Sequence, residues 1–128
     1  MILTMHGLST MHCNLVTDIR VAKETGYEAL EIVADKLLRY LDQGYAADEL
    51  NPIFRSNSIR PVVINALHFV DRVDPVEREQ LLSEGERLCA AAEAIGCQTI
   101  QLTFSQRHEG KPWPEVRKLV GRSLADVA

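Results

Sequence analysis

A helix–glycine–strand unit that occurs twice is the feature that most constrains the fold of this chain. Residues 22–32 align with residues 92–102, and in both copies a helical spacing of apolar residues ends at a glycine, Gly26 or Gly96, before a short apolar strand pattern. Glycine just past a helix supplies a left-handed backbone that a β-carbon would penalise. Brief apolar strands are typical of a parallel sheet covered by helices. The repeat therefore predicts an α/β fold built from βα units of about 35 residues each.

The same analysis, extended along the chain, predicts four strands that are each followed by helical sequence. The expected strands cover residues 2–6, 27–33, 59–66 and 98–103. Four βα units are half of a (β/α)8 barrel, which takes about 250 residues when whole. We therefore predict a TIM-barrel type fold with only the first four βα units present, a half-barrel that forms one domain over residues 1–128. An open doubly wound sheet is the alternative, although no glycine-rich phosphate loop follows any strand.

The charge and the hydropathy of the chain argue against two classes of partner. The formal net charge is −4 and the basic residues are scattered, the closest group being Arg117, Lys118 and Arg122, which we expect on the solvated face of a helix. Because phosphate contacts use clustered basic residues, we predict no nucleic-acid partner. No apolar run approaches about 20 residues, and residues 1–6 lack the features of a signal peptide, so we predict no membrane partner.

The cysteines indicate a reducing compartment. The chain has three of them, Cys13, Cys89 and Cys97, and no CxxC motif. This pattern argues against a disulfide framework and favours the cytoplasm. We expect Cys89, in an alanine-rich helical segment, and Cys97, at the start of a strand, to pack in the core. For Cys13, which follows the first strand, the alternative is a catalytic pair with His12, although adjacent residues rarely orient correctly for such a pair.

Polar residues occupy the expected ends of the strands. Glu31 and Gln101 hold equivalent positions in the two repeat copies, one residue before the last apolar residue of each strand. The C-terminal ends of parallel strands are where α/β folds build their sites. His6, Glu31 and His68 come from three strand ends, so we expect them to converge on one mouth. The alternative is that these side chains only face a polar barrel interior or a helix.

Three segments resemble the xylose-isomerase-like TIM-barrel superfamily of sugar phosphate isomerases and epimerases. They are Gly-Tyr-Glu-Ala-Leu-Glu-Ile at 26–32, Asp-Lys-Leu-Leu-Arg-Tyr-Leu at 35–41 and Ile-Arg-Pro-Val-Val-Ile-Asn-Ala-Leu at 59–67. The first is common across the superfamily, whereas the other two at this spacing are similar to those of 2-keto-myo-inositol isomerases (inosose isomerases). The resemblance continues through residues 71–79 and the strand after Gly96, and it implies the N-terminal half of such a barrel.

The resemblance implies a metal-dependent isomerase or epimerase of inositol catabolism that acts on a sugar or cyclitol ketone. Family barrels hold one divalent metal (Zn, Mn or Mg) with two Glu, an Asp and a His of their second half, so the resemblance implies neither a metal ligand nor a catalytic residue in 1–128. It implies instead that side chains at the first four strand ends bind the substrate, namely His6, Glu31, Asn65, His68, Gln101 or Thr103, and Trp113. Metal ligation, as by histidines of endonuclease relatives, is the alternative role of His68.

The isomerisation that the resemblance implies needs groups that these residues would supply in part. Moving a carbonyl to the neighbouring carbon takes a base that removes an α-proton and a cation that stabilises the enediolate oxygen. Glu31 would contribute one carboxylate, and the histidines would bond substrate hydroxyls. One alternative is a non-catalytic half-barrel that forms a homo-oligomer through its unpaired strand edges. An apurinic-site endonuclease-like function is another alternative, which the acidic net charge opposes.

Overall fold

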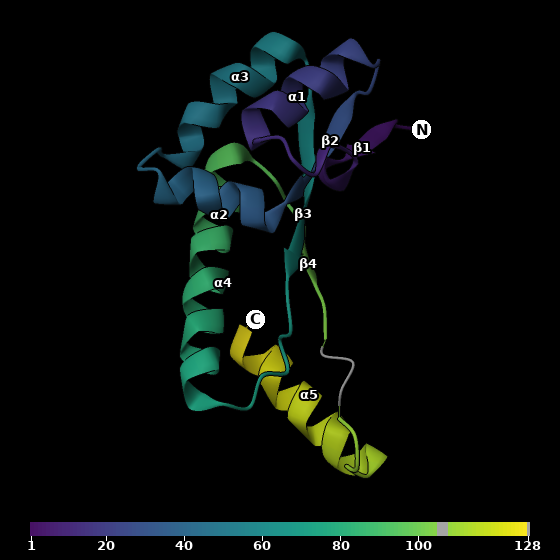
Figure 1. Ribbon diagram of the computed structural model, residues 1–128, viewed down its shortest axis with the longest axis vertical. Helices are drawn as coiled ribbons and strands as arrows, with labels where there is room; N and C mark the ends of the chain where they lie inside the picture. Colours follow the sequence, from purple (N-terminus) through teal and green to yellow (C-terminus); the bar gives the residue numbers. More distant parts are fainter. Residues whose placement is uncertain (105–107, 128) are drawn as a thin grey trace.

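The computed structural model describes residues 1–104 and 108–127 (Figure 1). Its elements are β1 (Thr4–His6), the 3₁₀ turn η1 (Gly7–Thr10), α1 (Leu15–Glu24), β2 (Ala29–Val33), α2 (Ala34–Asp42), the 3₁₀ turn η2 (Ala47–Glu49), α3 (Leu50–Asn57), β3 (Arg60–Leu67), α4 (Pro75–Ile95), β4 (Ile100–Leu102) and α5 (Trp113–Val127). All the predicted strands are present, and the first, second and fourth are shorter than expected because pairing begins only at Thr4, Ala29 and Ile100.

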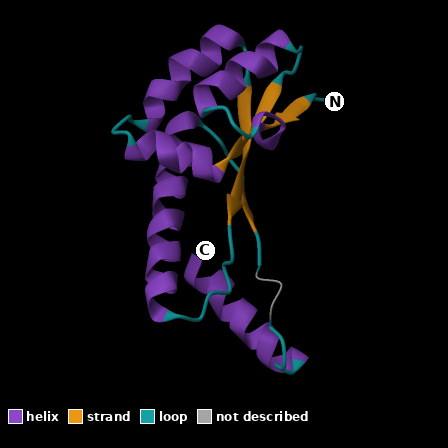
Figure 2. Cartoon of the chain, viewed as in Figure 1, coloured by secondary structure: helices purple, strands orange, loops and turns teal. Residues whose placement is uncertain are grey.

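The four strands form one parallel sheet in the order β1-β2-β3-β4. A doubly wound sheet reverses its strand order at a switch point, whereas the strands of a barrel follow one another in sequence. Figure 2 shows α1 to α4 gathered on one side of the strands, as expected when every crossover has the same hand. The chain is therefore an α/β half-barrel, as predicted, and the doubly wound alternative is wrong.

Local signals in the sequence set the ends of the longest elements. Gly26 and Gly96 have φ values of 82° and 72°, the left-handed conformation predicted for both. The side chain of Asp74 accepts hydrogen bonds from the backbone amides of Val76 and Glu77, so it caps α4. A capping aspartate also places negative charge at the positive end of the helix dipole.

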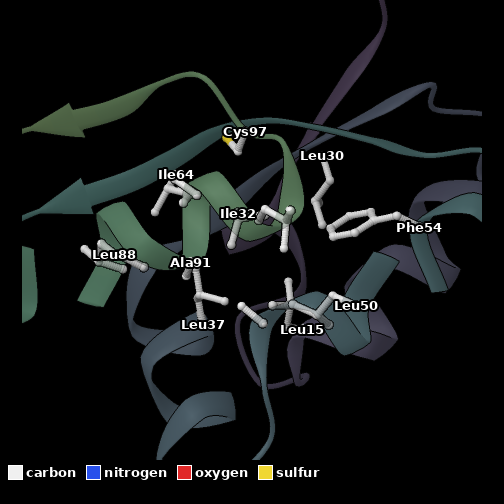
Figure 3. Close-up of a cluster of buried hydrophobic side chains, with 14 of the residues drawn as sticks. Leu15, Leu30, Ile32, Leu37, Leu50, Phe54, Ile64, Leu88, Ala91 and Cys97 are labelled. Carbon is white, nitrogen blue, oxygen red and sulfur yellow. The ribbon is translucent and has the colours of Figure 1, made fainter. Parts of the chain in front are cut away.

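A single apolar core fills the space between the sheet and the helices on that side (Figure 3). Its largest buried side chains include Leu15, Leu30, Ile32, Leu37, Leu50, Ile64 and Leu88. Cys97 is buried within it, as predicted, whereas Cys89 is exposed and the prediction for that residue is wrong. The side of α4 that faces this core carries the buried residues Leu81, Gly85, Leu88, Ala91, Ala92 and Ile95.

The last helix packs less completely than the others. Among the described residues of α5 only Val116 and Ser123 are buried, and Leu124 is 37% exposed. An apolar cavity of about 300 Å³ separates α5 from α4 and from the ends of β3 and β4. None of the described helices is long and apolar enough to cross a membrane.

Candidate functional site

Three polar side chains from the ends of β1, β2 and β3 meet at the C-terminal edge of the sheet. We name His6, Glu31 and Asn65 the mouth cluster. The side-chain amide of Asn65 donates a hydrogen bond to Glu31 Oε1. The Nε2 atom of His6 lies 3.4 Å from the same oxygen and 3.3 Å from Asn65 Nδ2. The side chains of His6 and Glu31 are 39% and 23% exposed, so a ligand can reach them.

The turn after β1 determines how the His6 ring bonds. The backbone amide of Leu8 donates to His6 Nδ1 at 3.0 Å, so that nitrogen acts as the acceptor. In the neutral ring the proton is then on Nε2, which donates toward Glu31 Oε1. Because His6 Nε2 and Asn65 Nδ2 are both donors, they converge on one carboxylate oxygen and do not bond to each other. The cluster thus offers two N–H donors and one carboxylate to a ligand.

A buried ion pair holds that turn in place. The Nζ atom of Lys36 lies 2.7 Å from Asp18 Oδ2 and also donates to the carbonyls of Gly7 and Thr10, at 2.9 and 2.8 Å. The hydroxyl of Thr10 donates to Asp18 Oδ1 at 2.6 Å. The side chains of Lys36 and Asp18 are 2% and 0% exposed. All three ammonium protons have acceptors, so the buried charges are fully paired and fix η1 between α1 and α2.

The other predicted site residues lie outside the mouth cluster. His68 Nδ1 pairs with Thr103 Oγ1 at 2.9 Å, beyond the ends of β3 and β4. Gln101 is exposed and lies beside Asn65 in the register of the sheet. Trp113 is 70% exposed at the start of α5. The structure therefore brings together three of the six predicted side chains.

A second polar pair was not predicted. His108 Nε2 bonds Asp71 Oδ2, and the Asp71 side chain is fully buried while that of His108 is 16% exposed. Both line a cleft of about 880 Å³ next to the ends of β3 and β4. Their position in the loops after these strands was the only available signal, because pairing of residues far apart in sequence depends on how the loops fold.

The ion pair of Asp18 and Lys36 was also missed, although its signal was stronger. Asp18 lies on the apolar stripe of α1 with Leu15 and Ala22, and Lys36 lies in α2 next to the buried Leu37. Opposite charges on the inner faces of successive helices indicate a buried pair, because a charge is rarely buried alone.

Burial changes the pKa of two titratable groups that lie outside the mouth cluster. It raises the pKa of the Cys97 thiol, and it raises the pKa of the Tyr40 hydroxyl, to which the nearby Glu49 carboxylate adds repulsion of the anion. Burial therefore favours the neutral form of both groups.

The described residues do not fit a complete metal site. At the mouth, His6 and Glu31 are the two side chains of metal-ligating type, and no group of three or more His, Cys, Asp or Glu able to hold a metal occurs within 1–104 and 108–127. Protein sites for catalytic divalent metals use three or more such ligands. The cluster can bind a polar ligand by hydrogen bonds, and by itself it does not make a metal centre.

Two curated inosose isomerases are similar to this chain in sequence. The protein of Halalkalibacterium halodurans is 34% identical over 83 residues, which are 64% of this chain and 29% of that protein. The protein of Bacillus velezensis is 32% identical over 84 residues, which are 65% of this chain and 30% of that protein. The similarity thus spans less than a third of the length of these relatives. No family model matches the chain.

Solved structures share the fold over almost the whole chain. A structure of the IolI protein with a bound zinc atom has a TM-score of 0.84 at 23% identity, and the match covers 99% of this chain and 46% of that one. The probable 3-DHS dehydratase AsbF of Bacillus anthracis gives a TM-score of 0.76 at 17% identity, with 99% and 47% covered. A xylose isomerase domain protein of Alicyclobacillus acidocaldarius gives 0.73 at 17% identity, with 98% and 44% covered. The chain therefore has the fold of half a TIM barrel, and it is similar in sequence to inosose isomerases.

Proposed function

We propose that this chain supplies the substrate-binding half of a metal-dependent isomerase or epimerase that acts on a sugar or cyclitol ketone. The observation that carries the proposal is the mouth cluster, which stands at the strand ends of a half-barrel similar in sequence to inosose isomerases. The strand ends are where barrels of this kind build their sites. Keto-inositols are the first substrates to test, because the sequence relatives are named for one.

The donors and the acceptor of the mouth cluster suit a polyol ketone. His6 Nε2–H and the Asn65 amide would donate to hydroxyl or carbonyl oxygens of the substrate, and Glu31 would accept from a hydroxyl. Both donors reach Glu31 Oε1 in the free protein, so a bound polyol would replace hydrogen bonds that already exist. Glu31 is also the one carboxylate of the cluster that could receive an α-proton, provided that the substrate carbon lies within hydrogen-bond reach. Gln101 is placed to extend the same row of donors.

The proposal assigns the metal to residues outside 1–128. The bound zinc of the IolI structure supports a divalent metal for barrels of this fold, whereas the described residues here do not make a metal centre. We assign no step to the metal and no catalytic role that depends on it. For the location, the three free cysteines support a reducing compartment, and we propose the cytoplasm.

Ligand titration with Glu31 variants tests the proposal directly. 2-Keto-myo-inositol should shift the amide resonances of His6, Glu31 and Asn65, and Glu31→Gln should weaken its binding about tenfold, because a charged acceptor is lost. The matched control is Glu28→Gln, which removes the same charge directly before the N-terminal end of β2. Equal weakening by the control, or resonance shifts only outside the mouth cluster, would overturn the proposal. Isomerase assays with Mn²⁺, Mg²⁺ and Zn²⁺ should show activity only with a longer chain from the same source.

A second proposal concerns assembly. In the described part of the chain, β1 and β4 each have one neighbouring strand, so each leaves a row of backbone donors and acceptors unpaired. As the alternative to a barrel completed by a longer chain, we propose that two copies of residues 1–128 pair β1 of one with β4 of the other and so close an eight-stranded barrel. Light scattering should then give twice the mass of 14.3 kDa. A monomer at high concentration would contradict this assembly and would leave the substrate proposal untouched.

A further inference from the structure

A groove with an unusual charge lies between α4, α5 and the loop after β3. Its volume is about 400 Å³, and we name it the cationic groove. Five basic side chains line it: Arg72, Arg78, Lys111, Lys118 and Arg122. Two acidic side chains, Glu115 and Asp126, also line it. The chain as a whole carries a net charge of −4, so the groove has the opposite sign to the molecule that contains it.

Most of these basic groups keep their charge free for a ligand. Asp126 pairs with Arg78. Arg72 donates to the backbone carbonyls of Glu77 and His68, at 3.4 and 3.2 Å, and these contacts hold the guanidinium without neutralising it. Arg72, Lys111, Lys118 and Arg122 form no ion pair with any residue in the part of the chain that the structure describes.

The basic side chains face one another across the groove. Lys118 and Arg122 are four residues apart on α5 and therefore share one face of that helix. Arg78, at the start of α4, donates a hydrogen bond to the Ser123 hydroxyl of α5 at 3.2 Å and pairs with Asp126, so the start of α4 contacts α5 on the side next to the face that carries Lys118 and Arg122. Like charges held together in a groove repel, and an anion between them would relieve that repulsion.

We propose that the cationic groove binds the phosphate group of a small phosphate ester. Arginine guanidinium groups match the geometry of phosphate oxygens, and a phosphate dianion would neutralise most of the excess positive charge in the groove. Arg72 and Lys111 also line the larger cleft of about 880 Å³ at the ends of β3 and β4. The organic part of the ester has room in that adjoining cleft, against the exposed ring of Phe69.

A single phosphate group fits the groove better than a nucleic-acid strand does. The basic side chains occupy one short groove, whereas a strand would follow a longer row of them. Away from the groove the acidic charge of the protein would repel a polyanion. This site does not depend on the isomerase proposal, because it uses none of the residues of the mouth cluster.

Titration in a phosphate-free buffer at low salt tests the site. Inorganic phosphate should shift the amide resonances of residues 72–78 and 111–126 in a saturable way, and glucose 6-phosphate should bind more tightly than phosphate does. Unphosphorylated glucose should cause no shift there. The double variant Lys118→Gln/Arg122→Gln should weaken phosphate binding at least about tenfold, since each lost contact is charge-assisted. Both side chains are exposed, so this variant keeps the core intact.

The matched control removes the same charge elsewhere. Arg20→Gln/Arg55→Gln changes two exposed arginines on α1 and α3, and it should alter phosphate binding less than about twofold, within the screening of distant surface charges. Equal weakening by both double variants would mean that only net charge matters and would overturn the site. So would the absence of saturation up to about 10 mM phosphate, above the range of a weak specific site. Equal affinity for phosphate and for glucose 6-phosphate would overturn the phosphate ester and leave free phosphate as the ligand. Tighter binding of a short DNA duplex would overturn the proposal that the ligand is small.

Discussion

The first three βα units and the fourth are held together in different ways. Around β1 to β3 the helices bury large apolar side chains and a fully paired ion pair, and the mouth cluster rests on that packed base. The fourth unit, β4 with α5, borders an apolar cavity on one side and a basic groove on the other. The difference teaches that the mouth cluster is pre-organised by burial, while the cationic groove depends on a helix that has few anchoring contacts.

The largest effect should come from breaking the ion pair under the mouth cluster. Lys36→Met leaves the buried Asp18 carboxylate and two turn carbonyls without their partner, which should lower the free energy of unfolding by about 3–5 kcal/mol. Urea unfolding followed by circular dichroism measures this change. The exposed Lys23, changed to Met, serves as the control and should cost less than about 1 kcal/mol. Changing Asp18 to Leu as well should restore part of the loss, because no unpaired charge remains.

A pair of leucines compares the packing of the two regions directly. Leu88 on α4 is fully buried, so Leu88→Ala should cost about 2–5 kcal/mol through lost contacts and a new cavity. Leu124 on α5 is 37% exposed beside an existing cavity, so Leu124→Ala should cost less than about 1 kcal/mol. Thermal unfolding of both variants provides the test. Equal losses would show that α5 is packed as firmly as α4 and would remove the contrast between the regions.

Two glycines should give changes of opposite sign. A β-carbon at Gly7 would lie 3.1 Å from the carbonyl oxygen of Glu31 and 3.1 Å from Val33 Cγ2, so Gly7→Ala should cost about 1–3 kcal/mol and displace the turn behind His6. A β-carbon at Gly121 in α5 would meet no atom within 4 Å. Gly121→Ala should therefore gain about 0.5–1 kcal/mol by restricting the unfolded chain. A gain at both positions would show that the β1 turn is as loosely packed as the face of α5.

The sequence predicted the features that depend on neighbouring residues. The left-handed glycines at 26 and 96 are local, and the strand order follows from repeated βα units. The meeting of His6 and Glu31 was predicted, because parallel strands end at one edge, whereas His68, expected beside them, lies outside the cluster and Asn65 is the third member. The ion pair of Asp18 with Lys36 had a signal in the opposite charges on the inner faces of two helices, but the contact itself depends on how those helices rotate against each other. Lys118 and Arg122 are exposed, as predicted, but only the packing of α5 shows that they border a groove.

The smallest effect should appear in two cysteines, Cys89 within α4 and Cys97 in the connection from α4 to β4. Burial raises the pKa of the Cys97 thiol, so iodoacetamide should modify the exposed Cys89 first and Cys97 much more slowly. The stability that comes from burying a neutral thiol is complete below the ordinary thiol pKa of about 8.5 and declines as the pH rises through the higher value in the folded protein. Unfolding measured across this pH range should show a small alkaline loss that Cys89→Ala keeps and Cys97→Ala abolishes. Equal labelling rates, followed by mass spectrometry, would mean that the segment leading into β4 opens as readily as the surface of α4, and the looseness of the fourth unit would then extend into its strand.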